Sequence, residues 1–180
     1  MNKAIFLDRD GTLNPDPGYI SNPDDYELYD GVKEALAKLK KAGYLLILIT
    51  NQSGISRGLF TEEQLDKVHN KMKRLLKEGS VTLDAIYYCP HHPDHPYKGV
   101  SDCNCRKPKP GLILQAIKEF DIDVKKSYMI GDRTSDIKIG LASNVPPVCI
   151  AKTFFKDYEN IPTFPTLLEA ADWILSQNNN

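Results

Sequence analysis

Residues 4–13 read AIFLDRDGTL, and this stretch decides the fold. Four apolar residues end abruptly in Asp8, as expected of a short buried strand in a parallel sheet. Asp8 and Asp10 are two positions apart, so on an extended chain their carboxylates point to the same side. Two close carboxylates resist double ionisation unless a cation lies between them. The stretch therefore predicts a buried strand with a metal-binding acidic end.

The rest of the chain alternates similar apolar runs with helical patterns. Apolar residues spaced three and four apart predict helices, and residues 61–64, Thr-Glu-Glu-Gln, have the form of a capping box. Strands that alternate with helices over short connections predict an α/β fold, a Rossmann-like parallel sheet with helices on both faces. The predicted strands are 4–7, 45–49, 85–88, 128–130 and 148–150, and the predicted helices are 31–42, one beginning at 61, 112–120, 135–143 and 167–175.

Length and composition indicate one domain over residues 1–180, because 180 residues with 41% hydrophobic residues can bury a single core. The formal net charge is −1 and the basic residues form no cluster, so we expect neither nucleic acid nor a membrane as a partner. The N-terminus has no signal-peptide pattern, which favours a cytoplasmic protein whose cysteines are thiols or metal ligands. We expect a monomer, with residues 178–180 frayed.

Polar residues follow several of the predicted strands. Thr50 comes after the second strand, and Asp132 after the fourth. Open parallel sheets bind ligands at the carboxyl ends of their strands. The carboxylates of Asp8, Asp10 and Asp132 would lie there, and such oxygen donors suit Mg²⁺. Each residue alone also has a structural explanation, since Asp8 and Asp10 can cap a turn and Asp132 the following helix. Their gathering at neighbouring strand ends favours a metal site over that alternative.

The order of these motifs resembles the haloacid dehalogenase superfamily of phosphotransferases. The likeness includes DRDGTL at 8–13, Thr50, a lysine after the third strand and GDRTSD at 131–136, so it spans most of the chain. It implies that Asp8 is the nucleophile of an aspartyl-phosphate mechanism and that Asp10 is the general acid and base. It further implies catalytic Mg²⁺ on Asp8, Asp132 and the backbone carbonyl of Asp10.

The resemblance also assigns the residues that hold the phosphoryl group. Thr50 and Lys107 are expected to bind its oxygens, and Lys107 is preferred to Lys109 because the residue after the arginine has this role in the related subfamily. Asp136 is expected to orient Lys107, although as a helix N-cap it would also have a purely structural role. Arg106 is expected to stabilise the phosphoryl group or to bind a second anionic group of the substrate.

Potential zinc ligands flank the loop at about 89–105, which follows the third strand. Three thiolates and one imidazole predict a closed, tetrahedral, structural zinc site, although the cysteines can also be unrelated thiols. His92 and His95 are alternatives to His91 as the imidazole. Zinc would fix the loop so that the basic residues at 106–107 face the phosphate. The expected ligands are Cys89, His91, Cys103 and Cys105.

The zinc loop with CRKPKPG at 105–111 resembles two sister groups, the D-glycero-D-manno-heptose 1,7-bisphosphate phosphatases and the histidinol-phosphate phosphatases. TNQSGISRG at 50–58 resembles the heptose group, whereas Arg133 resembles the histidinol group. The likeness implies removal of the C7 phosphate from the heptose bisphosphate, a step towards ADP-heptose and the lipopolysaccharide core. Hydrolysis of histidinol phosphate is the alternative.

Substrate specificity is expected in loops, because the stretch between Asp10 and Gly31 is too short for a cap domain. A zinc-stabilised binding module without catalysis is the alternative from a different class, but it would be expected to lose Asp8 or Asp10. Whether Arg57 contacts substrate stays open. The expected substrate contacts are Asp16, Gly18, Tyr19, Asn51, Ser53, Arg106 and Arg133.

Overall fold

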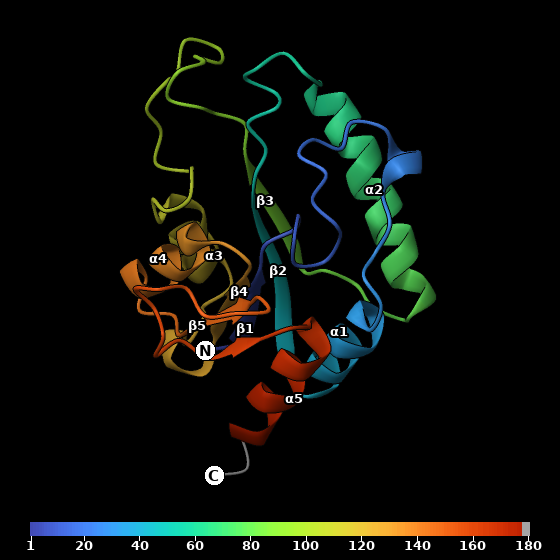
Figure 1. Cartoon of the computed structure of the whole chain (residues 1–180), viewed down its shortest axis with the longest axis vertical. Coiled ribbons are helices and arrows are strands. Elements are labelled where there is room, and N and C mark those ends of the chain that lie inside the picture. Colours follow the sequence, from blue (N-terminus) through green and yellow to red (C-terminus); the bar gives the residue numbers. More distant parts are fainter. Residues whose placement is uncertain (178–180) are drawn as a thin grey trace.

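The computed structural model describes residues 1–177 and contains a six-stranded, wholly parallel sheet covered by helices (Figure 1). The strand order is β3-β2-β1-β4-β5-β6, so β1 lies between β2 and β4. This confirms the predicted α/β sheet; the prediction for residues 178–180 lies outside the described part. The strands are β1 (Lys3–Leu7), β2 (Tyr44–Asn51), β3 (Ala85–Cys89), β4 (Tyr128–Gly131), β5 (Pro147–Ile150) and β6 (Thr163–Phe164).

Helices cover both faces of the sheet, as predicted. α1, α2 and α5 pack on one face, and α3 and α4 on the other (Figure 1). The predicted capping box is present at the start of α2, where Thr61 and Gln64 exchange hydrogen bonds of 2.9 and 3.1 Å. The helices are α1 (Val32–Lys41), α2 (Glu62–Glu78), α3 (Gly111–Glu119), α4 (Thr134–Ala142) and α5 (Leu167–Gln177), with 3-10 turns η1 (Pro23–Asp25) and η2 (Val124–Lys126).

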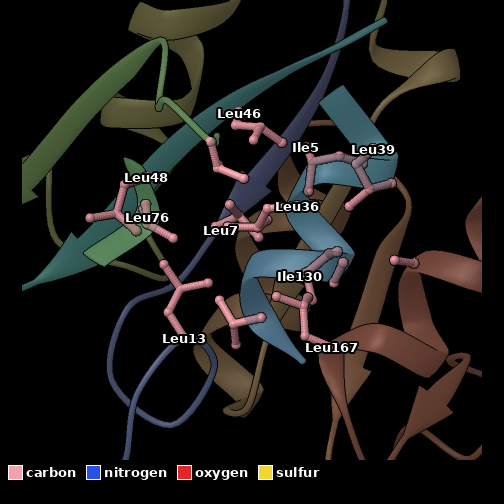
Figure 2. Packing of buried hydrophobic residues seen from close by; sticks show 14 of the residues in the cluster. Ile5, Leu7, Leu13, Leu36, Leu39, Leu46, Leu48, Leu76, Ile130 and Leu167 are labelled. Atoms are coloured by element: carbon pink, nitrogen blue, oxygen red, sulfur yellow. The ribbon is translucent and has the colours of Figure 1, made fainter. Parts of the chain in front are cut away.

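The core lies on both sides of β1, because successive residues of a strand point to opposite faces. Ile5 and Leu7 belong to the hydrophobic cluster under α1, α2 and α5, and Phe6 belongs to the cluster under α3 and α4. Figure 2 shows Leu36 of α1 and Leu76 of α2 within the first cluster. Burial on both faces explains why β1 is a continuous apolar run rather than an alternating one.

The sequence did not predict strand β6, and the segment from 8 to 31 is unusually long for a connection with little regular structure. β6, only two residues long, has too little pattern to be recognised in a sequence. The segment from 8 to 31 contains η1 and no α-helix or longer strand, so it crosses the carboxyl edge of the sheet as an irregular loop. No helix in the described residues is long and apolar enough to cross a membrane.

Candidate active site

The predicted polar residues meet at the carboxyl edge of the sheet. β2 and β4 both pair with β1, and their register aligns Leu7 with Leu48 and Ile130, so the residues that follow lie side by side. A cavity of about 230 Å³ opens there. It is lined by Asp8, Asp10, Asp16, Gly18, Tyr19, Thr50, Asn51, Gln52, Ser53, Arg106, Lys107, Arg133 and Ser135.

A buried lysine lies between two carboxylates at the floor of this cavity. Lys107 Nζ is 2.8 Å from Asp8 Oδ1 and 2.6 Å from Asp136 Oδ1. Burial raises the pKa of Asp8 to about 7; the Lys107 charge opposes this rise, whereas Asp136 and Asp10 add to it. Burial alone would lower the pKa of Lys107, but the carboxylates of Asp136 and Asp8 raise it. The ammonium group is therefore kept charged beside Asp8.

Side chains from the end of β2 and the first turn of α4 fix Lys107 in this position. The amide of Asn51 accepts from Lys107 N at 3.0 Å and donates to Lys107 O at 3.2 Å, so it binds both backbone groups of the lysine. Asp136 Oδ2 accepts from Arg133 N at 3.0 Å while Oδ1 binds the lysine. Asp136 is thus the third residue of α4 rather than its N-cap, which is Arg133. Asp136 therefore stabilises the first turn of α4 with one oxygen and orients Lys107 with the other.

We predict that Asp136→Asn lowers the free energy of unfolding by about 3 kcal/mol, because breaking a buried ion pair leaves its partner charge undercompensated. Urea denaturation followed by circular dichroism measures the loss. Glu78→Gln is the matched control, since its partner Lys33 is exposed and such pairs contribute little. Equal stability losses in the two variants would contradict the buried pairing of Lys107.

Asp132 is the carboxylate whose surroundings best fit a bound cation. Its Oδ1 atom is buried and has no hydrogen-bond partner among residues 1–177. Burial, helped by Asp136 and opposed by Arg133, raises the pKa of Asp132 to about 6. Gly11 has φ of +84°, and a Cβ there would come within 2.1 Å of Asp132 Oδ2, so only glycine leaves room for this carboxylate. Carboxylate oxygens of Asp8, Asp132 and Asp136 lie within 4.8 Å of one another. Since Asp136 is already bound, Asp8 and Asp132 remain as donors that fit Mg²⁺.

Asp10 is held by three side chains. Arg9 donates to both of its oxygens, at 3.0 and 2.9 Å, Asn14 donates to Oδ1 at 2.9 Å, and Gln52 donates to Oδ2 at 2.9 Å. Burial opposes ionisation of Asp10, but the charge and hydrogen bonds of Arg9, with those of Asn14 and Gln52, lower its pKa. Gln52 also donates to Thr50 Oγ1 at 3.0 Å and so links the two motifs.

The structure brings Cys89, His91, Cys103 and Cys105 into one cluster. The Sγ atom of Cys105 lies 3.0 Å from Cys89 Sγ and 3.2 Å from Cys103 Sγ, and the Sγ atoms of Cys89 and Cys103 are 3.6 Å apart. His91 Nδ1 is 3.3 Å from Cys105 Sγ and 3.8 Å from Cys89 Sγ. Tetrahedral zinc–thiolate bonds give ligand separations of about 3.8 Å, so these four residues fit zinc after a small expansion.

The other histidines of this loop point elsewhere. His92 and His95 lie 2.9 and 3.2 Å from the guanidinium of Arg57, which is not among the residues that line the cavity. Of the three imidazoles considered for zinc, the structure thus places His91 with the thiols. The fourth cysteine, Cys149, is buried in β5, outside the cluster.

Charged loops form the rim of the cavity. Arg133 pairs with Asp16, and Asp16 Oδ1 accepts from Gly18 N at 2.9 Å. Arg106 lines the cavity and donates to the backbone carbonyl of His91 at 3.1 Å, which ties it to the cluster of three cysteines and His91. The surface next to Asp8 therefore carries two guanidinium groups beyond the buried lysine.

Sequence reasoning missed three residues around Asp10. Arg9 and His69 are buried, with 1% and 4% exposure, and Gln52 bridges Asp10 and Thr50. The signal for His69 was present, because it falls between Val68 and Met72 on the apolar face of the helix. The burial of Arg9 carried no such signal, since a charged residue after a strand is usually expected in solvent.

A parallel sheet with Asp8 and Asp10 after its central strand, Thr50 after the next, and Lys107 and Asp132 beside them defines a phosphatase of the haloacid dehalogenase class. Sequence comparison agrees, since the family described as polynucleotide kinase 3 phosphatase matches residues 3–161. A D-glycero-beta-D-manno-heptose-1,7-bisphosphate 7-phosphatase of Haemophilus influenzae is 52% identical over 153 residues, 85% of this chain and 83% of the relative. The chain belongs to this family and groups with its heptose-bisphosphate phosphatases.

Two further relatives extend the match over nearly the whole chain. The enzyme of the same name from Escherichia coli K12 is 44% identical over 174 residues, 96% of this chain and 88% of the relative. The crystal structure of the D,D-heptose 1,7-bisphosphate phosphatase of B. bronchiseptica, complexed with magnesium and phosphate, matches with a TM-score of 0.85 at 31% identity. That match covers 97% of this chain and 99% of the other, so the fold agrees over nearly the whole length.

Proposed function

We propose that this phosphatase removes the C7 phosphate of D-glycero-β-D-manno-heptose 1,7-bisphosphate through an aspartyl-phosphate on Asp8. The observation that carries the proposal is the position of the Asp8 carboxylate at the floor of the cavity, 2.8 Å from the buried Lys107 ammonium. Asp10 lines the same cavity. The names of the relatives at 44–52% identity supply the substrate class. The product would serve synthesis of ADP-heptose for the lipopolysaccharide core.

In the first half-reaction, an Asp8 oxygen attacks phosphorus in line with the ester oxygen, and the P–O bond to the sugar breaks. Asp10 donates a proton to the departing alkoxide, which leaves as the free hydroxyl. Lys107 and Thr50 bind the equatorial phosphoryl oxygens, so their contribution is positioning and charge stabilisation. Asn51 and Asp136 support this step by fixing Lys107.

In the second half-reaction, Asp10 takes a proton from water, which attacks phosphorus and releases inorganic phosphate from Asp8. Asp8, Asp132 and the backbone carbonyl of Asp10 would hold Mg²⁺. When bound, Mg²⁺ neutralises the charge that gathers between the carboxylates and the phosphate. The unpartnered Asp132 Oδ1 is the feature of this chain that supports such a site.

A sugar bisphosphate has a second phosphate, and binding it requires positive charge in addition to the groups that hold the scissile phosphate. Arg106 and Arg133 line the same cavity as Asp8, and guanidinium is the natural bidentate partner of a second phosphate. Asp16, Gly18 and Tyr19 complete the rim and would contact the sugar. We expect no cap domain, so these loops would set the specificity of a single-domain, monomeric enzyme.

We further infer structural zinc on Cys89, His91, Cys103 and Cys105. All four donors would be protein atoms, which leaves no position for a reactive water. The ion would fix the loop whose last ligand directly precedes Arg106 and Lys107. The hydrogen bond from Arg106 to the carbonyl of His91 supports this coupling between metal cluster and cavity.

Steady-state kcat/KM for heptose 1,7-bisphosphate and histidinol phosphate, measured side by side with Mg²⁺, tests the substrate. We expect a preference of at least about a hundredfold for the heptose, which corresponds to about 2.7 kcal/mol of transition-state discrimination. The reverse preference would assign the enzyme to histidinol phosphate and make Arg133 the deciding feature. Activity on neither substrate would contradict both assignments.

A further inference from the structure

A buried chain of polar contacts leads from α2 to Asp10. His69, on the inner face of α2, lies with its Nε2 atom 3.2 Å from Arg9 Nη1. Arg9 then binds both carboxylate oxygens of Asp10 through Nε and Nη2, and Nη2 also donates to Gln52 Oε1 at 3.2 Å. Three of these residues were not assigned any role by the phosphatase motifs, yet they enclose the group that must move protons.

The direction of the first contact follows from the chemistry of its partners. Arginine has only N–H donors, so His69 Nε2 must be the unprotonated acceptor and the ring proton must lie on Nδ1. Burial, with the charges of Arg9 and Lys73 and against that of Asp10, lowers the pKa of His69 to about 3. The ring is therefore neutral in the working range of the enzyme, and a neutral acceptor is what a buried guanidinium can use.

We propose that His69 is a positioning residue that, through Arg9, holds the carboxylate of Asp10 in the orientation needed for proton transfer. This inference rests on the proposed role of Asp10. Four hydrogen bonds of Arg9 lead to Asp10, His69 and Gln52, and the side chain is only 1% exposed. If the acceptor at His69 is lost, a buried N–H group of Arg9 is left without a hydrogen bond, which is costly in free energy. The Arg9 guanidinium then turns towards another partner, and the Asp10 carboxylate that it binds turns with it.

Two substrates separate positioning of Asp10 from a general effect on the fold. The sugar alkoxide needs a proton as it leaves, whereas p-nitrophenolate is stable as an anion and leaves without one. In a phosphoenzyme mechanism, kcat/KM reports the steps up to departure of this first product. The kcat/KM for the heptose bisphosphate therefore depends on Asp10 as an acid far more than the kcat/KM for p-nitrophenyl phosphate does.

The test compares His69→Leu, which removes the acceptor, with His69→Gln, whose Oε1 reaches about the position of Nε2. We expect His69→Leu to lower kcat/KM about tenfold for the heptose bisphosphate, mainly through kcat, and less than about threefold for p-nitrophenyl phosphate. His69→Gln should stay within about threefold of wild type for both. Met72→Leu, on the same face of α2, controls for altered packing and should change neither.

Equal losses on the two substrates, or a glutamine variant no better than leucine, would overturn the proposal. If His69→Leu does not fold, His69→Asn replaces it, because its shorter side chain cannot reach Arg9. Wild type and Asp10→Asn are measured first; wild-type activity on neither substrate refutes the proposed function itself. The ring tautomer, read from ¹⁵N shifts of wild-type His69, decides the contact independently: a proton on Nδ1 supports it, and a proton on Nε2 excludes it.

Discussion

Asp8→Asn is expected to lower kcat by about four orders of magnitude or more and to abolish the phosphoenzyme, because the amide cannot act as the anionic nucleophile. The side chain keeps its shape and can still accept a hydrogen bond from Lys107 at the position of Oδ1. The folded structure should therefore persist. The loss would fall on kcat, since the groups that bind phosphate, Thr50 and Lys107, remain.

Rapid acid quench of the enzyme with substrate, followed by mass spectrometry of the intact protein and its peptides, tests this directly. Wild type should carry one phosphate on the peptide that contains Asp8, and the variant none. Asp24→Asn is the matched control, because it makes the same chemical change at an exposed carboxylate outside the cavity and should leave both rate and phosphoenzyme unchanged. A phosphoenzyme in the Asp8→Asn variant would place the nucleophile on another residue.

The strands and the edge that carries the site were predictable because their signals are local. A buried parallel strand is a continuous apolar run, and Asp8 marks the end of the first one within four residues. Because β2 and β4 flank β1 in the sheet, Thr50 and Asp132 lie beside it. The capping box at Thr61 is equally local, because it depends on two residues of one turn. β6 has no such pattern and depends on pairing with β5.

Side-chain contacts between distant segments were not predictable in the same way. Asn51 was expected to contact substrate, and it does line the cavity, but its amide binds the backbone of Lys107, 56 positions away. The contact between Arg9 and His69 joins residues 60 positions apart. Nothing in a sequence specifies which polar groups satisfy each other across a core, because that depends on how helices and strands pack.

The same distinction applies to the charges around the site. Whether Arg57 contacts substrate was open from the sequence, and in the structure its guanidinium lies against His92 and His95. Arg133 has the cavity position expected of it, but it is paired with Asp16 in the structure. A second phosphate would therefore have to compete with this carboxylate for the arginine, which favours a dianionic ligand over a weakly charged one.

Loss of one thiol from the cluster of Cys89, His91, Cys103 and Cys105 is expected to have a similarly large effect. Cys103→Ser should lower the zinc content of the purified protein from about one ion per chain to well below that value, because the remaining donors cannot complete a tetrahedral site. The loop at 89–105 should then become sensitive to limited proteolysis. Since Arg106 and Lys107 directly follow the last ligand, kcat/KM should fall about tenfold to a hundredfold.

Elemental analysis gives the zinc content, and activity is assayed with saturating Mg²⁺ so that loss of catalytic metal does not contribute. Cys149→Ala is one control, because this thiol is buried in β5 away from the cluster and should retain zinc. His91→Asn and His92→Asn form a matched pair within the loop. Only the first should lose zinc, because His91 Nδ1 lies 3.3 Å from Cys105 Sγ, whereas His92 faces Arg57. Zinc loss from His92→Asn alone would assign the imidazole ligand to the other residue, and stoichiometric zinc in Cys103→Ser would exclude this site.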